Sequence, residues 1–464
     1  MKRFLGSSVT GLCLIFIFFL TLGGRVVSQA PDFPPSPLTP QQITELGLKF
    51  SGEDPQEISQ SVAELETWFH VLQAKLGGLE GAALGDTLLK LLHQDFLTQY
   101  QSEQTRLDQL LKTGNYNCVS SALVYLILGR RLGLTVEAVE VPSHAFCRVL
   151  VGSTWVDVET TTAQGWDPGT KKTFHDEFGH VTGYSYVPPG EYTQRRNLDA
   201  RGLLGLVLQN RCSLLQKQGL FSQAIPLALQ RWSFDHSEAS LTMLETVYKD
   251  AIAVFNNQQN YSEGLSLVSD LISQTGITPS VKKLTLALVT NQCHSWSERQ
   301  DYTSARELIH VWEEKKVLNP TQVQNLLKTL TENELVTQLP QLTVEQAQER
   351  ITQALKAGLI NDSQSNQFLT WIYSKAIEKL AQEKGYAASV TYIQNLSPAL
   401  QQLPGLQELH HQLTQAWSAS IHNEFAHLWN TGQHEKARQV LKEGLRVLPD
   451  SPLLQQDLNR LPQD

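Results

Sequence analysis

A repeat of roughly 40 residues in the second half of the chain constrains the fold most. An aromatic or apolar residue (once histidine) is followed three positions later by a small one at six places. These pairs are Phe221/Ala224, Tyr261/Gly264, Tyr302/Ala305, Val344/Ala347, Tyr386/Ser389 and His434/Ala437, with leading residues spaced by 40, 41, 42, 42 and 48 positions. Such even spacing indicates stacked helical hairpins, in which a small residue lets neighbouring helices pack closely. We therefore expect residues 200–464 to form an all-α helical-repeat solenoid.

The last repeat unit resembles a tetratricopeptide repeat. It runs from Gly432 through residues 433–437 and Gly444 to Pro449. The other units are longer than the roughly 34 residues of that family, so the resemblance concerns paired helices more than the consensus. An irregular helical domain with chance spacing is the alternative interpretation. If the solenoid forms, its concave surface is expected to recruit a protein or peptide, either as substrate or as partner.

Composition excludes several classes of protein. A chain of 464 residues is too long for one compact core, so two or more domains are expected. Its hydrophobic content of 41% excludes disorder, and a formal net charge of −9 gives no reason to expect a nucleic-acid surface. Five scattered cysteines without a C-x-x-C pair fit neither a disulfide scaffold nor a zinc module.

The N-terminus has the layout of an export signal. Lys2 and Arg3 precede an apolar run over residues 11–22, and Ser28 and Ala30 suit a signal peptidase site before Pro31. A signal peptide over residues 1–30 is one interpretation, and an uncleaved membrane anchor is the other, since Pro31 would hinder cleavage. Both predict an extracytoplasmic protein, periplasmic or secreted, that meets the membrane only through this segment if it is uncleaved.

Three further segments follow the signal. Residues 31–40 contain five prolines and predict a stiff linker that does not belong to a core. Residues 41–111 carry apolar side chains at helical spacing with a glycine-rich break at 77–81, which predicts two to four helices. Residues 136–188 are β-branched, aromatic and rich in turn residues. We assign residues 41–195 to one domain, with a boundary near residues 190–200.

A cysteine begins the most strongly patterned helix of that domain. Asn117 is a suitable N-cap, so Cys118 falls in the first turn of a helix that ends at Gly133. The positive end of the helix dipole favours a thiolate there. Cys118 is therefore a candidate nucleophile. The alternatives are a small apolar residue at a helix start and one half of a disulfide with Cys147.

A histidine and two acids follow on a predicted β-hairpin. With Gly152-Ser153 as a two-residue turn, Val151 faces Thr154, and His144 shares a face with Asp157 and Glu159. In this register Glu159 lies diagonal to His144 and within reach of its ring. Asp157 lies opposite Arg148, which makes an ion pair with Arg148 its expected contact. A slip of one residue would reverse these assignments, so Asp157 remains the alternative acid.

These motifs together resemble the transglutaminase-like core of the papain-like cysteine enzymes. The resemblance rests on a cysteine at a helix start, the sequence His-Ala-aromatic in a strand, and Trp-x-x-Val-acid-x-Thr in the next strand, over about residues 85–190. It implies that Cys118 attacks an acyl carbon, His144 moves the proton and Glu159 orients the histidine. The family usually has Asp at the last position. The resulting fold class is an α+β transglutaminase-like core with a preceding helical segment, joined to the all-α solenoid.

Other candidates for the site are fewer. An oxyanion hole would need the backbone N–H of Cys118 and a second donor, for which Asn117 and Asn115 are candidates; cap or loop roles are the alternative. His175 and His180 are five residues apart in a segment that reads as loop, which is unsuitable spacing for a metal site on a helix. Phosphate-binding and dinucleotide motifs are absent from the sequence, so we expect no cofactor and no metal.

Two functions are compatible with this sequence. The first is an exported thiol enzyme that acts on an amide or peptide bond through an acyl-enzyme, with hydrolysis favoured over cross-linking. The second is a non-catalytic protein-binding scaffold with a degenerate transglutaminase-like core, which the Glu at position 159 would favour. A disulfide between Cys118 and Cys147 would support the second function, and free thiols the first.

Overall fold

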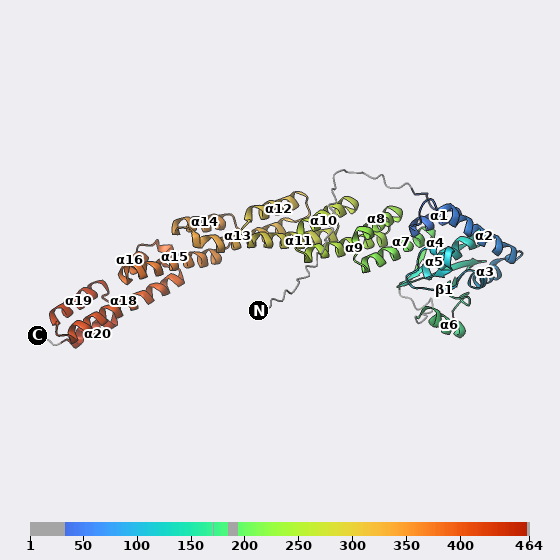
Figure 1. The fold of residues 1–464 in the computed structure, drawn as a ribbon. Helices are drawn as coiled ribbons and strands as arrows, with labels where there is room; N and C mark the ends of the chain where they lie inside the picture. The colour runs from blue at the N-terminus through green and yellow to red at the C-terminus, as the bar shows by residue number, and fades with distance from the viewer. Residues whose placement is uncertain (1–32, 170, 184–193, 462–464) are drawn as a thin grey trace, which may run out of the picture. The chain divides into compact units, whose positions relative to one another are not determined.

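The structure is a computed structural model, and it describes residues 33–169, 171–183 and 194–461 (Figure 1). The chain divides into two compact units, Met1–Val247 and Tyr248–Asp464. The expected signal or anchor at residues 1–30 lies outside the described residues. Within the described part, no helix combines the length and the apolar character needed to cross a membrane.

Four helices open the first unit: α1 (Pro40–Ser51), α2 (Ile58–Leu76), α3 (Gly81–Asp95) and α4 (Leu107–Thr113). This confirms the prediction of two to four helices, and the break falls at the predicted glycines. Helix α1 begins with a capping box, in which the Thr39 hydroxyl and the Gln42 side chain satisfy each other's backbone N–H groups.

The described part of the proline-rich segment packs onto this unit. Phe33 makes edge-to-face contacts with Phe50 and Phe234 at centroid distances of 6.0 and 4.9 Å. Leu38 is buried in the same core. The expectation of a spacer outside the core is therefore wrong for residues 33–39, because Phe33 and Leu38 supply apolar surface that the prolines obscured.

A four-stranded antiparallel sheet forms the β part of the first unit. Its strands are β3 (Val136–Val141), β4 (His144–Val151), β5 (Thr154–Val158) and β6 (Arg196–Leu198), in the order β5-β4-β3-β6. Val151 pairs with Thr154 across the two-residue turn, as predicted. Two further short strands, β1 (Gln99–Tyr100) and β2 (Asn115–Tyr116), pair in parallel just before the cysteine.

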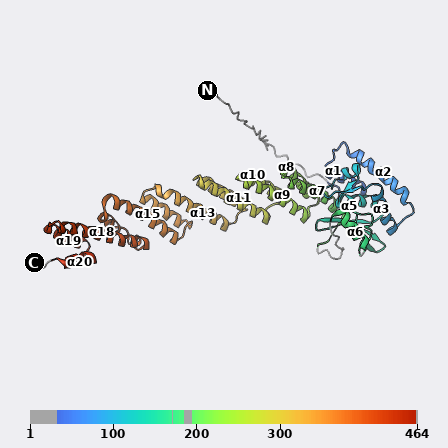
Figure 2. The same ribbon diagram turned by 60° about the horizontal axis from the view of Figure 1, so that its bottom comes forward.

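Helix α5 (Cys118–Arg131) lies in the middle of the first unit (Figure 2). It packs against α1, α3, α7 and the sheet, and every residue from Cys118 to Gly129 is buried. Tertiary packing therefore covers this short helix from all sides. Asn117 caps its start and Gly133 follows its end with a φ of 91°, as the sequence indicated.

Helix α6 (Lys172–Thr182) replaces the loop expected around His175 and His180. Its buried Phe174 and Phe178 lie one helical turn apart, and Gly183 ends the helix in a left-handed conformation. Gly183 therefore marks the end of a helix in a segment that the sequence predicted to be a loop. Residues 190–193, at the start of the expected domain boundary, lie outside the described residues.

Helix α7 (Ala200–Lys217) belongs to the core of the first unit, although the sequence placed it in the repeat region. Its apolar side chains Leu203, Leu204, Val207 and Leu208 are fully buried. It packs against α1, α5 and α8 (Phe221–Asp235). The first helix beyond the sheet therefore completes the domain that contains Cys118, and α9 (Glu238–Asn257) follows α8.

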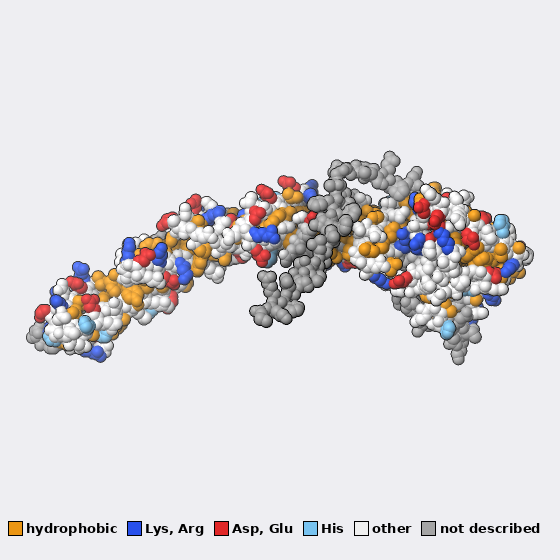
Figure 3. Space-filling model, viewed as in Figure 1, with side chains coloured by type: hydrophobic (Ala, Val, Ile, Leu, Met, Phe, Trp, Pro, Cys, Tyr) orange, Lys and Arg blue, Asp and Glu red, His pale blue; other side chains and the backbone are white. Residues whose placement is uncertain are grey.

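The second unit consists of helices that pack in sequence order. They are α10 (Tyr261–Thr275), α11 (Pro279–Glu298), α12 (Tyr302–Glu314), α13 (Pro320–Gln338), α14 (Val344–Lys356), α15 (Asp362–Lys384), α16 (Tyr386–Gln394), α17 (Pro398–Gln401), α18 (Pro404–Asn430), α19 (His434–Val447) and α20 (Pro452–Arg460), with a 3₁₀ turn at Leu339–Gln341. On the face shown in Figure 3, acidic and basic side chains are interspersed.

The repeat found in the sequence coincides with helix starts. Each of the six leading residues is the first residue of a helix, from Phe221 in α8 to His434 in α19. Each small residue three positions later is buried. Two of them receive a contact from a cysteine twelve residues earlier: Cys212 Sγ lies 3.4 Å from the Ala224 oxygen, and Cys293 Sγ lies 3.6 Å from the Ala305 oxygen. This arrangement fits a helical-repeat solenoid.

Candidate active site

The start of α5 is held by a reciprocal cap. Asn117 Oδ1 accepts hydrogen bonds of 3.0 Å from the N–H groups of Val119 and Ser120, and the Asn117 N–H donates to Ser120 Oγ at 2.9 Å. Cys118 is therefore the first residue of the helix, where the backbone N–H groups and the helix dipole favour a negative charge. Its side chain is largely buried, with 9% of the residue exposed.

The loop at residues 101–106 holds this helix start from the side. Asn117 Nδ2 donates to the Ser102 carbonyl at 3.1 Å, and Ser120 Oγ donates to the Gln104 carbonyl at 3.0 Å. Gln104 Nε2 in turn donates to the Asn115 carbonyl at 2.8 Å. The cap, the loop and the nucleophile candidate consequently form one hydrogen-bonded group.

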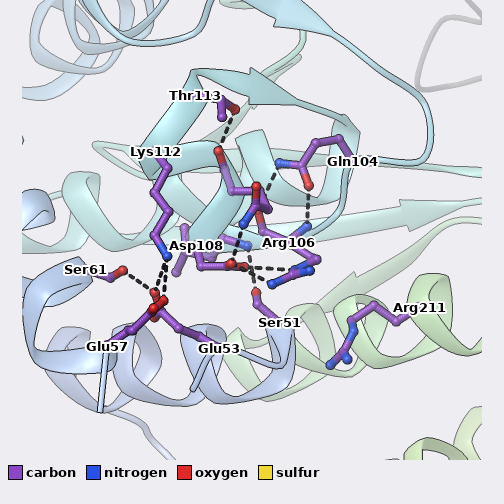
Figure 4. Close-up of polar contacts among 12 residues, drawn as sticks. Ser51, Glu53, Glu57, Ser61, Gln104, Arg106, Asp108, Lys112, Thr113 and Arg211 are labelled. Atoms are coloured by element: carbon purple, nitrogen blue, oxygen red, sulfur yellow. Dashed lines mark hydrogen bonds and ion pairs between the residues drawn. The ribbon is translucent and has the colours of Figure 1, made fainter. Parts of the chain in front are cut away.

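A second polar cluster fixes the other end of that loop (Figure 4). Arg106 forms two hydrogen bonds with the buried carboxylate of Asp108, of 3.1 and 2.7 Å. The N–H of Leu107 donates to Ser51 Oγ at 2.7 Å, which ties α4 to α1. Lys112 bridges Glu57 at 2.9 Å and Glu53 at 3.3 Å, which ties α4 to the start of α2. These contacts anchor the loop to the helical segment before the sheet.

His144 lies at the first position of β4, directly after the Pro142-Ser143 turn. Ser143 adopts a φ of 62°, as tight hairpin turns require. The ring atom Nε2 lies 2.7 Å from Glu159 Oε2. The Cys118 side chain is near enough to the ring to raise the pKa of His144, and both residues line the same cleft. The structure thus brings Cys118, His144 and Glu159 together.

The electrostatic surroundings favour a protonated imidazole. Burial alone would lower the pKa of His144, but the Glu159 carboxylate and the neighbouring Cys118 side chain outweigh this effect. The pKa of His144 is therefore well above its ordinary value of 6.5. An imidazolium beside a thiol stabilises the thiolate, which is the attacking form of cysteine.

Glu159 is held rigidly although it follows the last residue of β5. It is 1% exposed, and its Oε1 accepts hydrogen bonds from the N–H and the hydroxyl of Thr161, at 3.1 and 2.8 Å. Gly165 packs against the Glu159 carbonyl so closely that a Cβ there would lie 1.8 Å from that oxygen. Only glycine fits this tight return of the chain.

Three side chains from other elements support the loop after Glu159. His93 Nε2 lies 3.1 Å from the Thr160 carbonyl, Tyr116 donates to the Thr161 carbonyl at 3.0 Å, and Ser121 Oγ lies 3.0 Å from Thr160 Oγ1. Burial lowers the pKa of His93 to about 4, so its ring is neutral and its N–H donates. Sequence reasoning missed His93, because it lies in an ordinary amphipathic helix far from the motifs.

A cleft of about 210 Å³ opens at Cys118 and His144. The loop at residues 100–103 and the β3–β4 turn line it together with α7, which contributes Leu206, Gln209, Asn210, Ser213, Leu214 and Lys217. A ligand in this cleft therefore reaches the thiol. Sequence reasoning did not foresee that α7 forms one of its walls.

Comparison with known families agrees with this geometry. The family model for the transglutaminase-like superfamily matches residues 57–165, a range that includes Cys118, His144 and Glu159. The chain contains a transglutaminase-like domain. The match begins one residue before α2, earlier than the resemblance read from the motifs, and ends before α6 and α7. No curated protein matches the chain.

In this transglutaminase-like domain the second acid has another partner than expected. Asp157 does lie opposite Arg148 in the sheet, as the register predicted. It binds Arg195 instead, through hydrogen bonds of 2.9 and 2.6 Å, while Arg148 binds Glu137. The predicted Asp157–Arg148 ion pair is therefore wrong. Strand β3, on the other side of β4, places Glu137 opposite Arg148.

The remaining cysteines of the described residues are free thiols. Cys147 lies on the opposite face of β4 from His144, is fully buried, and contacts the Ala122 carbonyl at 3.3 Å. Burial raises the pKa of this thiol far above its ordinary value. Cys118 and Cys147 are unpaired, so the disulfide considered from the sequence is absent from the structure.

The two asparagines considered for an oxyanion hole make structural contacts. Both polar ends of the Asn117 side chain are used, by the helix cap and by the Ser102 carbonyl. Asn115 pairs with Gln99 in the short parallel sheet, and its carbonyl accepts from Gln104. Within the part of the chain that the structure describes, no group of three His, Cys, Asp or Glu side chains is arranged to hold a metal ion.

Proposed function

We propose that the protein is a thiol enzyme that hydrolyses amide or peptide bonds, with Cys118 as nucleophile, His144 as acid and base, and Glu159 as the acid that orients the histidine. The observation that carries the proposal is the 2.7 Å contact between His144 Nε2 and Glu159 Oε2, beside a cleft that Cys118 and His144 line together. This order of nucleophile, base and orienting acid is the arrangement that covalent acyl transfer requires.

The reaction follows from these positions. Cys118 Sγ attacks the carbonyl carbon of the amide and gives a tetrahedral oxyanion, which the backbone N–H of Cys118 stabilises. The carbon–nitrogen bond then breaks, and His144 donates its proton to the leaving amine. A thioester remains on Cys118. A water molecule that transfers its proton to His144 attacks the thioester, the carboxylic acid leaves, and the thiol is restored.

Hydrolysis is proposed over cross-linking because the cleft is polar and reaches solvent. Glu103 and Lys217 line it, and both are exposed. Water therefore reaches the thioester at a concentration that a protein amine cannot match. Glutamate in place of the usual aspartate does not argue against activity, since its carboxylate contacts the histidine ring.

The remaining parts of the proposal rest on the sequence. Export from the cytoplasm is proposed on the signal-like residues 1–30, and recruitment of a protein or peptide is proposed for the helices of the second unit. The scaffold alternative predicts an unreactive thiol, so a test of thiol reactivity separates the two functions.

Labelling with iodoacetamide tests the proposal. At pH 6, where an ordinary thiol reacts slowly, mass spectrometry is expected to find modification at Cys118 in the wild type. His144→Ala should slow this labelling at least tenfold, and Cys147→Ser should leave it unchanged. Unmodified Cys118 in the wild type, or equal rates with and without His144, would favour the scaffold.

A further inference from the structure

The cleft at Cys118 continues into a second cavity of about 830 Å³ within the first unit. The two cavities share lining residues, namely Glu140, Val141, Ser143, Gln209 and Ser213. A continuous groove therefore leads from the thiol, past the β3–β4 turn, along α7 and to the first half of α9. We call it the α7–α9 groove.

Both helices present neutral polar side chains to this groove. Gln209, Ser213 and Gln216 of α7 line it at helical spacing, which puts them on one face. Thr242 and Thr246 of α9 line it one turn apart. Amide and hydroxyl groups both donate and accept hydrogen bonds, as the N–H and C=O groups of a peptide main chain do.

The charges along the groove are few: Glu103 and Lys217 lie at its Cys118 end, and two others neutralise each other. Glu140 forms an ion pair with Arg196 at the edge of the sheet. Glu238 adds one exposed carboxylate at the start of α9. Among the described residues, none that lines the second cavity is aromatic. Sugar rings, which bind by stacking on aromatic faces, therefore find no aromatic platform in the second cavity, and strongly charged peptides find no complementary charge there.

Gln209 is oriented by a buried charge. Its Oε1 accepts a hydrogen bond from Nη1 of Arg231, which is only 2% exposed. The same guanidinium lies 3.7 Å from Asp235, so its position is fixed from a second side. The Gln209 amide is thereby held with its Nε2 group left as a donor for a ligand. Preorganised donors of this kind bind with a smaller loss of side-chain entropy.

We propose that the α7–α9 groove binds an extended peptide with uncharged polar side chains, whose main chain hydrogen-bonds to Gln209, Ser213 and Thr242. The inference rests on the proposed function and names its substrate class. It also assigns substrate recognition to α7 and α9, which lie beyond the residues matched by the family model.

Binding to the full-length Cys118→Ala protein tests the inference. The probe is a fluorescent library of acetylated, amidated dodecapeptides built from Ala, Gly, Ser, Thr, Asn and Gln, compared with Glu-rich and Lys-rich libraries and with chitohexaose. Adding Gln209→Ala and Ser213→Ala to the Cys118→Ala protein should weaken binding of the neutral library about tenfold, since each lost hydrogen bond lowers affinity roughly two- to tenfold. The matched control pair is Gln223→Ala and Ser222→Ala on α8, where both side chains are exposed outside the groove.

Equal binding by the groove pair and the control pair would overturn the inference. Preference for a charged library or for chitohexaose, or binding of no probe at all, would overturn it as well. Iodoacetamide labelling of a Gln209→Ala/Ser213→Ala variant that keeps Cys118 distinguishes a failure of the groove proposal from a failure of the proposed function. Normal labelling of Cys118 without peptide binding refutes the groove alone, whereas an inert Cys118 refutes the enzyme.

Discussion

The loop after Glu159 and helix α11 of the second unit satisfy their buried polar groups in different ways. Around Glu159 the partners are distant in the sequence: His93 and Thr160 are 67 residues apart, and Tyr116 and Thr161 are 45 apart. In α11, buried Thr285 instead donates to the carbonyl of Val281, one turn earlier on the same helix.

This difference predicts which kind of substitution each region tolerates. A buried group that depends on a distant partner loses its hydrogen bond when either element shifts, so such contacts select a single arrangement. A hydroxyl bonded within its own helix is indifferent to the neighbouring helices, whose spacing is then set by side-chain size. The loop after Glu159 is therefore expected to be sensitive to polar substitutions, and the apolar core around Ile351 to changes in volume.

The largest effect is expected from Glu159→Gln. The amide keeps the shape of the side chain but removes the charge that holds the His144 ring in its orientation, so kcat/KM should fall on the order of 10³-fold. The measurement is hydrolysis of the neutral peptide library by full-length protein. Asp157→Asn, which loosens only the contact with Arg195, should cost less than tenfold. A larger loss with Asp157→Asn would make Asp157 the orienting acid.

An intermediate effect is expected from His93→Gln, through the pH dependence of stability. The pKa of His93 is about 4 when folded and about 6.5 when unfolded, so the unfolded state takes up the proton first as the pH falls. The stability contributed by the neutral ring is complete above pH 6.5 and is lost towards pH 4, by about 3 kcal/mol.

The side-chain amide introduced by His93→Gln would keep an N–H donor for Thr160 without titrating, so the variant should lose this part of the pH dependence. Urea unfolding at several pH values, followed by hydrogen exchange in peptides covering α5, measures it. His70→Gln, at an exposed position on α2, is the matched control and should follow the wild type. Parallel curves for wild type and His93→Gln between pH 4 and 6.5 would contradict the role given to His93.

The smallest effect is expected from a matched pair of substitutions to valine. Ile351→Val removes one methyl group from the core of the second unit and should lower the free energy of unfolding by about 1 kcal/mol, with no change in hydrolysis. Thr161→Val is nearly isosteric but removes the hydroxyl that donates to Glu159. A similar loss of stability, about 1–2 kcal/mol, should here come with slower hydrolysis. If the two variants lost different amounts of stability but hydrolysed the peptide at equal rates, the contrast between the two regions would be wrong.

Much of the site could be predicted from local patterns. The N-cap at Asn117, the two-residue turn at Gly152-Ser153 and the strand register depend on neighbouring residues, so the approach of Glu159 to His144 followed from counting along two strands. The helix starts of the repeats were also visible, because each combines a large leading residue with a buried small one. The solenoid itself and the catalytic roles stay predictions.

The sequence by itself determined which residues could do chemistry, since a cap, a turn and a side-chain alternation are short-range properties of the chain. Only the tertiary structure decided what surrounds them: the choice of Arg195 over Arg148 as partner of Asp157, the neutral His93 beneath the loop after Glu159, and α7 as a wall of the cleft. These contacts join elements that are far apart in the sequence, and no local pattern encodes them because they depend on how whole elements pack.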